Sequence, residues 1–364
     1  MLRHPMLRTT FTDTPDGPRQ TVHRSIPANF QEVDARQWNE QRINDWIEQE
    51  ADKPFDLSHE SALRVSVLYG QNETLLLASV HHIATDLWGL VLIAADIQRD
   101  YSALIQGEWI TVTPPKHQYR EHVQWQQNLI ASDAGLHLQN YWLDALRGAS
   151  MQLDLPLDYS RPAVMTMRGD KSIRMLSSAL AAKVRQFCKQ EAITPFVLFQ
   201  SVFQLLAYAL TGRQQFLVGT PTVGRSAPGM EEVVGDFANP VVLRAEVVAK
   251  NSAKQLLQQV KQTVLEALKH QDYPFPLLIQ RLNPPRDASR TPVFQLMFLW
   301  HQGNPGAAFQ QGLLQGILPQ SGPRGTPYDL MLAVSDLGDS FELNWHYATA
   351  LFTAETIDRF ADAF

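Results

Sequence analysis

Cysteine is nearly absent from this sequence, which has Cys188 as its only one among 364 residues. A single cysteine excludes an internal disulfide and any thiolate metal cluster, and such sparse use is typical of a reducing, cytoplasmic compartment. The residues around Cys188 have a helical pattern. We therefore interpret it as a packed thiol rather than a nucleophile.

Long apolar runs and an excess of positive charge are also missing. No stretch reaches the roughly 18 apolar residues of a membrane span, and the first residues carry arginines without the apolar core of a signal peptide. Lys and Arg number 31 against 37 Asp and Glu, which gives a net charge of -6. We therefore expect neither a membrane nor nucleic acid as a partner.

Several catalytic motifs are absent as well. The chain contains no Gly-x-Ser-x-Gly elbow, no Gly-x-x-x-x-Gly-Lys phosphate loop and no Gly-x-Gly-x-x-Gly fingerprint. Hydrolysis by a serine nucleophile, nucleotide chemistry and dinucleotide redox chemistry all lose support from these absences.

Apolar periodicity, by contrast, is clear and predicts an α/β fold. Residues 62–69 alternate, turn formers follow at 70–73, and residues 74–80 form a nearly continuous apolar run, so a hairpin is expected. Helices are expected at 90–106, 119–129, 136–146, 195–210 and 252–270, and further strands at 172–176, 216–220, 240–247, 293–300, 328–334 and 341–347.

The length suits about two domains. Prolines and turn formers over residues 153–162 interrupt regular structure, and we place the boundary just beyond them. This divides an N-terminal subdomain, residues 1–163, from a C-terminal subdomain, residues 164–364. A long loop rich in Gly and Gln is expected over residues 302–326, and loops of that length tend to be functional or disordered.

The most informative segment contains His81 and His82, the only adjacent pair among 11 histidines, between the expected strand at 74–80 and the next helix. An imidazole at such a junction can titrate near neutral pH, while Asp86 can cap the helix or accept a bond from a cation. We interpret the group as a general base fixed by Asp86. Spacing alone leaves two alternatives: core histidines beside a capping Asp86, and a metal site, for which further ligands are lacking.

Residues 81–89 (HHIATDLWG) resemble the HHxxxD motif of condensation domains of non-ribosomal peptide synthetases. Further stretches resemble motifs of that family in the same order: residues 4–9, 55–64, 119–126, 219–225, 235–239, 270–275 and 286–295. The resemblance therefore spans essentially the whole chain.

This resemblance implies two chloramphenicol-acetyltransferase-like subdomains in a V with a central tunnel. Donor and acceptor carrier proteins would enter the tunnel from opposite faces, and their 4'-phosphopantetheine arms would bring the substrates, with no cofactor bound by the domain itself. The implied reaction is aminolysis of a donor thioester by a carrier-bound aminoacyl group. Neighbouring adenylation domains or polyketide synthase modules are implied as further partners.

The resemblance also implies roles for individual residues. His82 would position the amine or accept its proton, and amides at the start of the following helix are candidates for stabilising the oxyanion. Asp86 would form a structural salt bridge with Arg64, His81 would point into the fold, and Gly89 would support the motif. No metal is implied.

Trp88 and Asn239 are expected near the tunnel, with core packing and a turn before Pro240 as their respective alternatives. The Asp86-Leu87-Trp88 version of the motif, with residues 239–244, most resembles members that follow polyketide or fatty-acyl modules.

A non-catalytic carrier-docking or recruitment domain of the same fold is the main alternative function, and an ester-forming or other HHxxxD acyltransferase is another. Relatives begin with a strand and a helix before residue 4 and continue past Phe364, so we expect a truncated N-terminal subdomain.

Overall fold

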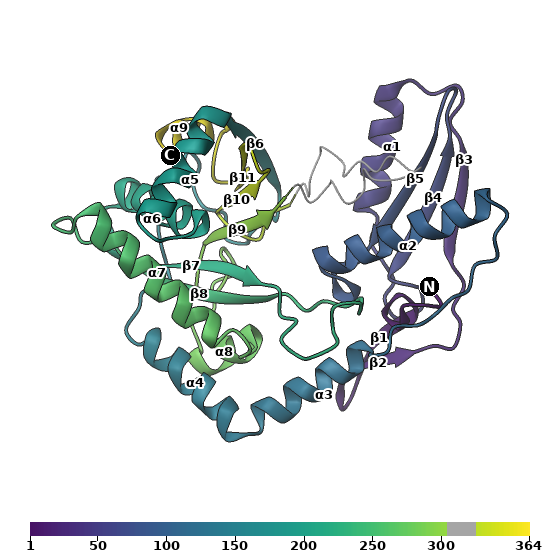
Figure 1. The fold of residues 1–364 in the computed structure, drawn as a ribbon, viewed down its shortest axis with the longest axis horizontal. Helices are drawn as coiled ribbons and strands as arrows, with labels where there is room; N and C mark the ends of the chain where they lie inside the picture. Colours follow the sequence, from purple (N-terminus) through teal and green to yellow (C-terminus); the bar gives the residue numbers. More distant parts are fainter. Residues whose placement is uncertain (304–324) are drawn as a thin grey trace. The chain divides into compact units, whose positions relative to one another are not determined.

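The computed structural model describes residues 1–303 and 325–364, which fold into two compact units (Figure 1). Unit 1 comprises Met1–Trp125 and Arg225–Phe237, and unit 2 comprises Gln126–Gly224 and Ala238–Phe364. Two subdomains were expected, and the V-shaped arrangement and its tunnel stay predictions. Residues 304–324 of the loop expected at 302–326 lie outside the described part.

The boundary between the units differs from the one expected after residue 163. The chain leaves unit 1 within a helix that runs from Tyr119 to Ile130, and a later segment returns to unit 1. The proline-containing stretch at 153–162 is not a linker, because Leu153 and Leu155 are buried in the core of unit 2. Prolines there break regular structure without separating domains.

Unit 1 contains a three-stranded sheet in the order β3-β4-β5, in which β3 is parallel to β4 and β4 is antiparallel to β5. A separate hairpin pairs β1 with β2. The bounds are β1 Thr9–Thr14, β2 Gly17–Val22, β3 Asn29–Asp34, β4 Leu63–Tyr69 and β5 Thr74–Val80 for the strands, and η1 Pro5–Arg8, α1 Glu40–Asp52, η2 His82–Ala84, α2 Leu87–Ile105 and α3 Tyr119–Ile130 for the helices.

The hairpin of β4 and β5 confirms the pattern seen in the sequence, whereas β1, β2, β3 and α1 were not predicted. The residues of β2 after Gly17 are exposed, and Glu50 is the buried residue of α1. Strand β2 has no apolar face to detect, whereas α1 has a narrow one, formed by Ile43, Trp46 and Ile47 among polar residues. Helix α2 packs on the sheet through Ile93, which contacts a small core that includes Leu7 and Leu63.

Unit 2 is built on a six-stranded mixed sheet in the order β6-β11-β10-β9-β7-β8. Strand β9 runs parallel to β10 and β7, and the other neighbouring pairs are antiparallel. The strands are β6 Gly169–Leu176, β7 Gln215–Thr222, β8 Asn239–Glu246, β9 Leu296–Gln302, β10 Leu330–Asp336 and β11 Phe341–Ala348. All were expected from the sequence to within a few residues, and the α/β class is confirmed.

Helices lie around this sheet (Figure 1), with bounds α4 Asp133–Ala145, α5 Ser178–Gln190, α6 Pro195–Thr211, α7 Ala253–Lys269, α8 Phe275–Leu282 and α9 Ala354–Ala363. The limits of α6 follow from its sequence. The Thr194 side chain accepts a hydrogen bond from Val197 N, Pro195 occupies the first turn, and Gly212 ends the helix at φ +66°.

No single helix among residues 1–303 and 325–364 is long and apolar enough to cross a membrane. The pair of α5 and α6, bent by 102°, passes the same test of length and composition only when taken together. Helix α6 buries Val197, Phe199 and Phe203 in the core of unit 2, as a core helix does, and the Cys188 thiol of α5 is buried there too.

Gly219 of β7 occupies a position in the core where only a residue without a side chain fits. A methyl group there would overlap the ring of Phe294, which is buried and stacked on Tyr328 with 5.7 Å between ring centroids. The aromatic ring therefore needs the space that the missing side chain leaves.

We expect Gly219→Ala to lower the free energy of unfolding by about 1–3 kcal/mol, because the ring of Phe294 must shift in a packed core. Urea denaturation measures this loss. Adding Phe294→Leu to Gly219→Ala should recover part of it, since a smaller side chain removes the overlap. Strictly additive losses in the double variant would show that the two residues do not clash.

Candidate active site

His81 serves the local fold at the end of β5. Its backbone N–H donates to Ala62 O at 2.9 Å, and its Nδ1 accepts a hydrogen bond from Ile83 N at 3.1 Å. The half-buried ring lies edge-on to Phe55, with 5.8 Å between centroids. Burial, with a smaller effect of His82, lowers the pKa of His81. A neutral ring that caps the turn agrees with the inward direction implied by the resemblance.

His82 has the opposite environment. It begins η2, and 75% of its side chain is exposed. Its Nδ1 lies 3.6 Å from Oδ2 of Asp236. The Asp236 carboxylate raises the pKa of His82, against partial desolvation of the ring, and Asp86 contributes a smaller effect in the same direction. The motif therefore presents one accessible imidazole beside a carboxylate.

Asp86 is buried and makes several contacts at once. One oxygen accepts from Gly89 N at 2.7 Å and caps α2, as the sequence predicts. The same carboxylate receives the Arg225 guanidinium at 2.9 and 3.1 Å and accepts from Phe237 N at 3.3 Å. Its oxygens are engaged in holding the fold, so Asp86 fixes the motif and is not itself presented to a substrate.

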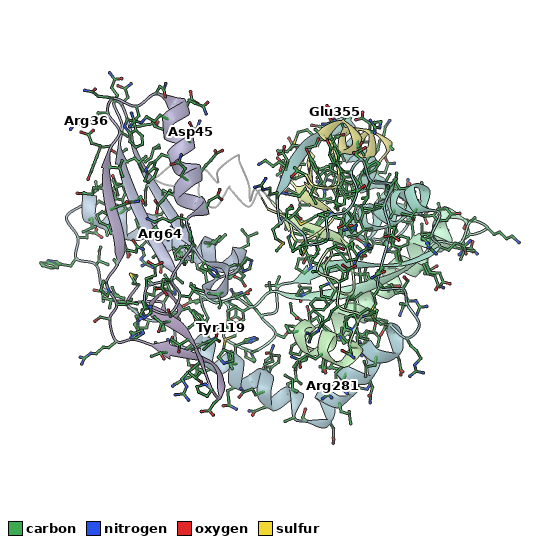
Figure 2. All side chains as sticks on the ribbon, turned by 180° about the vertical axis from the view of Figure 1, so that it is seen from behind. Arg36, Asp45, Arg64, Tyr119, Arg281 and Glu355 are labelled. Carbon is green, nitrogen blue, oxygen red and sulfur yellow. The ribbon has the colours of Figure 1, made fainter. Side chains whose placement is uncertain are left out.

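The expected salt bridge between Asp86 and Arg64 is wrong. Arg64 lies on β4 (Figure 2), with a side chain 2% exposed, and its NH1 is 3.3 Å from a carboxylate oxygen of Glu50. Its guanidinium also donates to the main-chain oxygens of Glu50, Lys53 and Pro54. These carbonyls lie at the C-terminal end of α1, where helices leave acceptors unpaired. Arg64 therefore anchors α1.

Arg225 takes the place expected for Arg64, although 139 residues separate it from Asp86 in the sequence. It donates to Met230 O at 2.8 Å and Val233 O at 2.7 Å, and its guanidinium lies 3.9 Å from the centre of the Phe237 ring. Burial lowers the pKa of Arg225, an effect that Asp86 opposes. These contacts hold segment 225–237 in unit 1.

Further hydrogen bonds join segment 235–237 to the histidine motif. Asp86 N donates to Gly235 O at 3.0 Å, and the Tyr119 hydroxyl, at the start of α3 (Figure 2), donates to Asp236 O at 2.6 Å. A methyl group at Gly235 would overlap the Tyr119 ring, and one at Gly89 would overlap the Thr85 hydroxyl. Both glycines are thus needed for close approach. Arg225 and Asp236 belong to stretches that carry the family resemblance, 219–225 and 235–239, but the sequence alone predicts no role for either residue.

The two residues expected near a tunnel differ in their surroundings. Trp88 is 48% exposed and donates from Nε1 to Glu231 O at 2.8 Å, so the core-packing alternative is wrong. Asn239, in unit 2, donates from Nδ2 to Gln271 O at 2.7 Å and Tyr273 O at 2.9 Å. Its Oδ1 accepts from Phe275 N at 2.9 Å. These contacts favour a structural role for Asn239.

The geometry supports proton transfer by His82. Within residues 1–303 and 325–364, no group of His, Cys, Asp and Glu side chains is placed to hold a metal ion. Asp86 faces a guanidinium, which would compete with a metal for the carboxylate. The Gly89 amide, at the start of α2, already donates to Asp86 and is therefore engaged in capping rather than in holding an oxyanion. An imidazole oriented by a carboxylate is the arrangement of a general base.

Comparisons with known proteins identify the family of the chain. A family model described as a condensation domain matches residues 1–364. A linear gramicidin synthase of Brevibacillus parabrevis is 32% identical over 98% of this chain, and phosphinothricin tripeptide synthetase PhsC of Streptomyces viridochromogenes is 30% identical over 99%. The chain spans 7% and 34% of the lengths of these two relatives.

A solved structure of a four-domain nonribosomal peptide synthetase bound to AMP and glycine has the same fold. It superposes with a TM-score of 0.86 at 24% identity and covers 99% of this chain, which corresponds to 28% of that protein. The likeness shows a shared fold.

The ion pair of Asp86 with Arg225 can be tested with substitutions that remove charge but keep polarity. We expect Asp86→Asn to lower the free energy of unfolding by about 3–5 kcal/mol, because it leaves a buried guanidinium unpaired. Asparagine still caps helices well, so the loss reports mainly on the charge. Chemical denaturation measures it.

The partner is identified by double variants. Arg225→Gln added to Asp86→Asn should cost much less than the sum of the single losses, whereas Arg64→Gln should be additive with Asp86→Asn. Coupling of Asp86 with Arg64 rather than Arg225 would contradict the observed pairing.

Proposed function

Because the chain belongs to the condensation-domain family, we propose that it forms an amide bond between two carrier-bound substrates. The donor is an acyl, polyketide or peptidyl thioester, and the acceptor is an aminoacyl group. The observation that carries the proposal is the exposed His82 imidazole, whose Nδ1 lies 3.6 Å from the Asp236 carboxylate. Members of this family are acyltransferases of this type.

The reaction requires a general base but no nucleophile from the protein. The acceptor amine attacks the thioester carbonyl, so a carbon–nitrogen bond forms and the carbon–sulfur bond breaks. The amine proton passes to Nε2 of His82, and the departing thiolate takes up a proton. Holding the amine against the carbonyl and relieving it of its proton are the tasks left to the protein.

Both substrates would arrive on 4'-phosphopantetheine arms of separate carrier proteins. The arms are part of the substrates, so the domain itself requires no bound cofactor under this proposal. Adenylation domains or polyketide synthase modules are the neighbours that would load or extend the carriers. The family assignment and the synthetases among the relatives support these partners.

We expect His82→Ala to lower the rate of amide formation by roughly 100- to 10,000-fold, the usual contribution of a general base. Its melting temperature should stay close to that of the unchanged protein, because the side chain is largely exposed. Mass spectrometry of the product formed from loaded donor and acceptor carriers measures the rate.

His59→Ala is the matched control, since His59 is another exposed histidine of unit 1, paired with Asp56. It should keep full activity. Equal activity of His82→Ala and the unchanged protein would remove His82 from the reaction. Carrier binding by the unchanged protein without any turnover would favour a docking domain of the same fold.

For the donor, we expect an aliphatic or polyketide-derived acyl group to be accepted more readily than a peptidyl group. The motivation is the Asp86-Leu87-Trp88 version of the motif together with residues 239–244. A competition between acyl-loaded and peptidyl-loaded donor carriers, with products counted by mass spectrometry, measures the preference. A dominant peptidyl product would refute it.

A further inference from the structure

We propose that Asp236 is the positioning residue of His82. Its carboxylate orients the His82 ring so that Nδ1 faces Asp236 and Nε2 is left to receive the proton of the attacking amine. The proposal concerns the same site and rests on the proposed function. It begins with the 3.6 Å approach of His82 Nδ1 to Asp236 Oδ2. An imidazole with one nitrogen held by a carboxylate keeps one orientation and one tautomer, which is what a directional base requires.

The Asp236 carboxylate makes few other contacts that would stabilise the fold. Its Oδ1 is buried and has no hydrogen-bond partner among the described residues, while Oδ2 faces His82. A buried oxygen without a partner lowers stability, so such a group is not explained by folding alone. An incompletely satisfied carboxylate beside an accessible imidazole is typical of a functional pair.

The main chain on both sides of Asp236 is locked to the motif that carries His82. Gly235 O accepts from Asp86 N at 3.0 Å, Asp236 O accepts from the Tyr119 hydroxyl at 2.6 Å, and Phe237 N donates to Asp86 Oδ2 at 3.3 Å. Asp86 therefore fixes both the turn after His82 and the segment that contains Asp236. The backbone segments that carry the carboxylate and the ring are therefore joined through Asp86.

The charged groups around His82 and Asp236 determine in which direction the rate should depend on pH. His82 is faced by Asp236, by the more distant Asp86 and by the neighbouring His81. Around Asp236 lie the Tyr119 hydroxyl and, beyond it, the Arg225 guanidinium. Asp236 has the largest effect and raises the pKa of His82. A base acts in its neutral form, so the acid limb of the rate profile lies at higher pH with Asp236 than without it.

Asp236→Asn is the test. We expect it to lower the pKa of His82, to move the acid limb of kcat/KM to lower pH, and to reduce the plateau rate by about tenfold or more, since an orienting carboxylate contributes at least that much in a histidine-based triad. NMR titration of the His82 ring, assigned by comparison with His82→Ala, measures the pKa independently of activity. Asp236→Glu should restore much of both properties.

Glu232→Gln is the matched control. Glu232 lies in the same segment, and its side chain is 68% exposed and 3.8 Å from Arg3. The control removes the same charge and should change neither the titration nor the rate. An unchanged His82 pKa in Asp236→Asn, or an unchanged rate profile, would overturn the proposal. If the unchanged protein formed no amide, the proposed function would fail, and the NMR titration would still decide whether Asp236 holds His82.

Discussion

The buried ion pair of Asp86 with Arg225 is the interaction on which the candidate site depends. Taking both charges out of water is costly, and a buried pair is often no more stabilising than apolar residues of similar volume. The ion pair is therefore important because it positions the backbone segments around the candidate site. One carboxylate caps α2, receives the guanidinium and anchors Phe237 N, and the guanidinium in turn holds the carbonyls of Met230 and Val233. A change at Asp86 would loosen each of these contacts together.

Through these contacts a buried scaffold determines the position of an exposed base. His82 itself is largely exposed, so its orientation must come from its neighbours. The turn that bears it is followed by the buried Asp86 and is capped by His81, whose ring contacts Phe55. Segment 225–237 then brings a carboxylate to its ring. The imidazole is thus accessible to substrate while its backbone and the neighbouring carboxylate are placed by buried residues.

Local signals in the sequence were sufficient for one part of the structure. The hairpin of β4 and β5, the limits of α6 and the capping role of Asp86 each depend on neighbouring residues. Strands β1 to β3 and helix α1 were missed because they bury little apolar surface. Arg225 and Asp236 were missed for another reason: their roles arise from pairing across 139 residues or more, which no local pattern encodes.

The pairing of Arg64 with Glu50, rather than with Asp86 as expected, follows from the cost of burying unpaired charge. The side chains of Arg64 and Arg225 in unit 1 are only 2% and 6% exposed, and each guanidinium needs its own carboxylate. Glu50 of α1 pairs with Arg64, whose guanidinium also donates to the main-chain oxygens of Glu50 and Lys53 at the end of that helix. Asp86 is thereby left to Arg225, which neutralises it. Because Asp86 is paired with a cation, Asp236 has the larger effect on the pKa of His82 and Asp86 the smaller one, so the electrostatics of the base depend on how the arginines are paired.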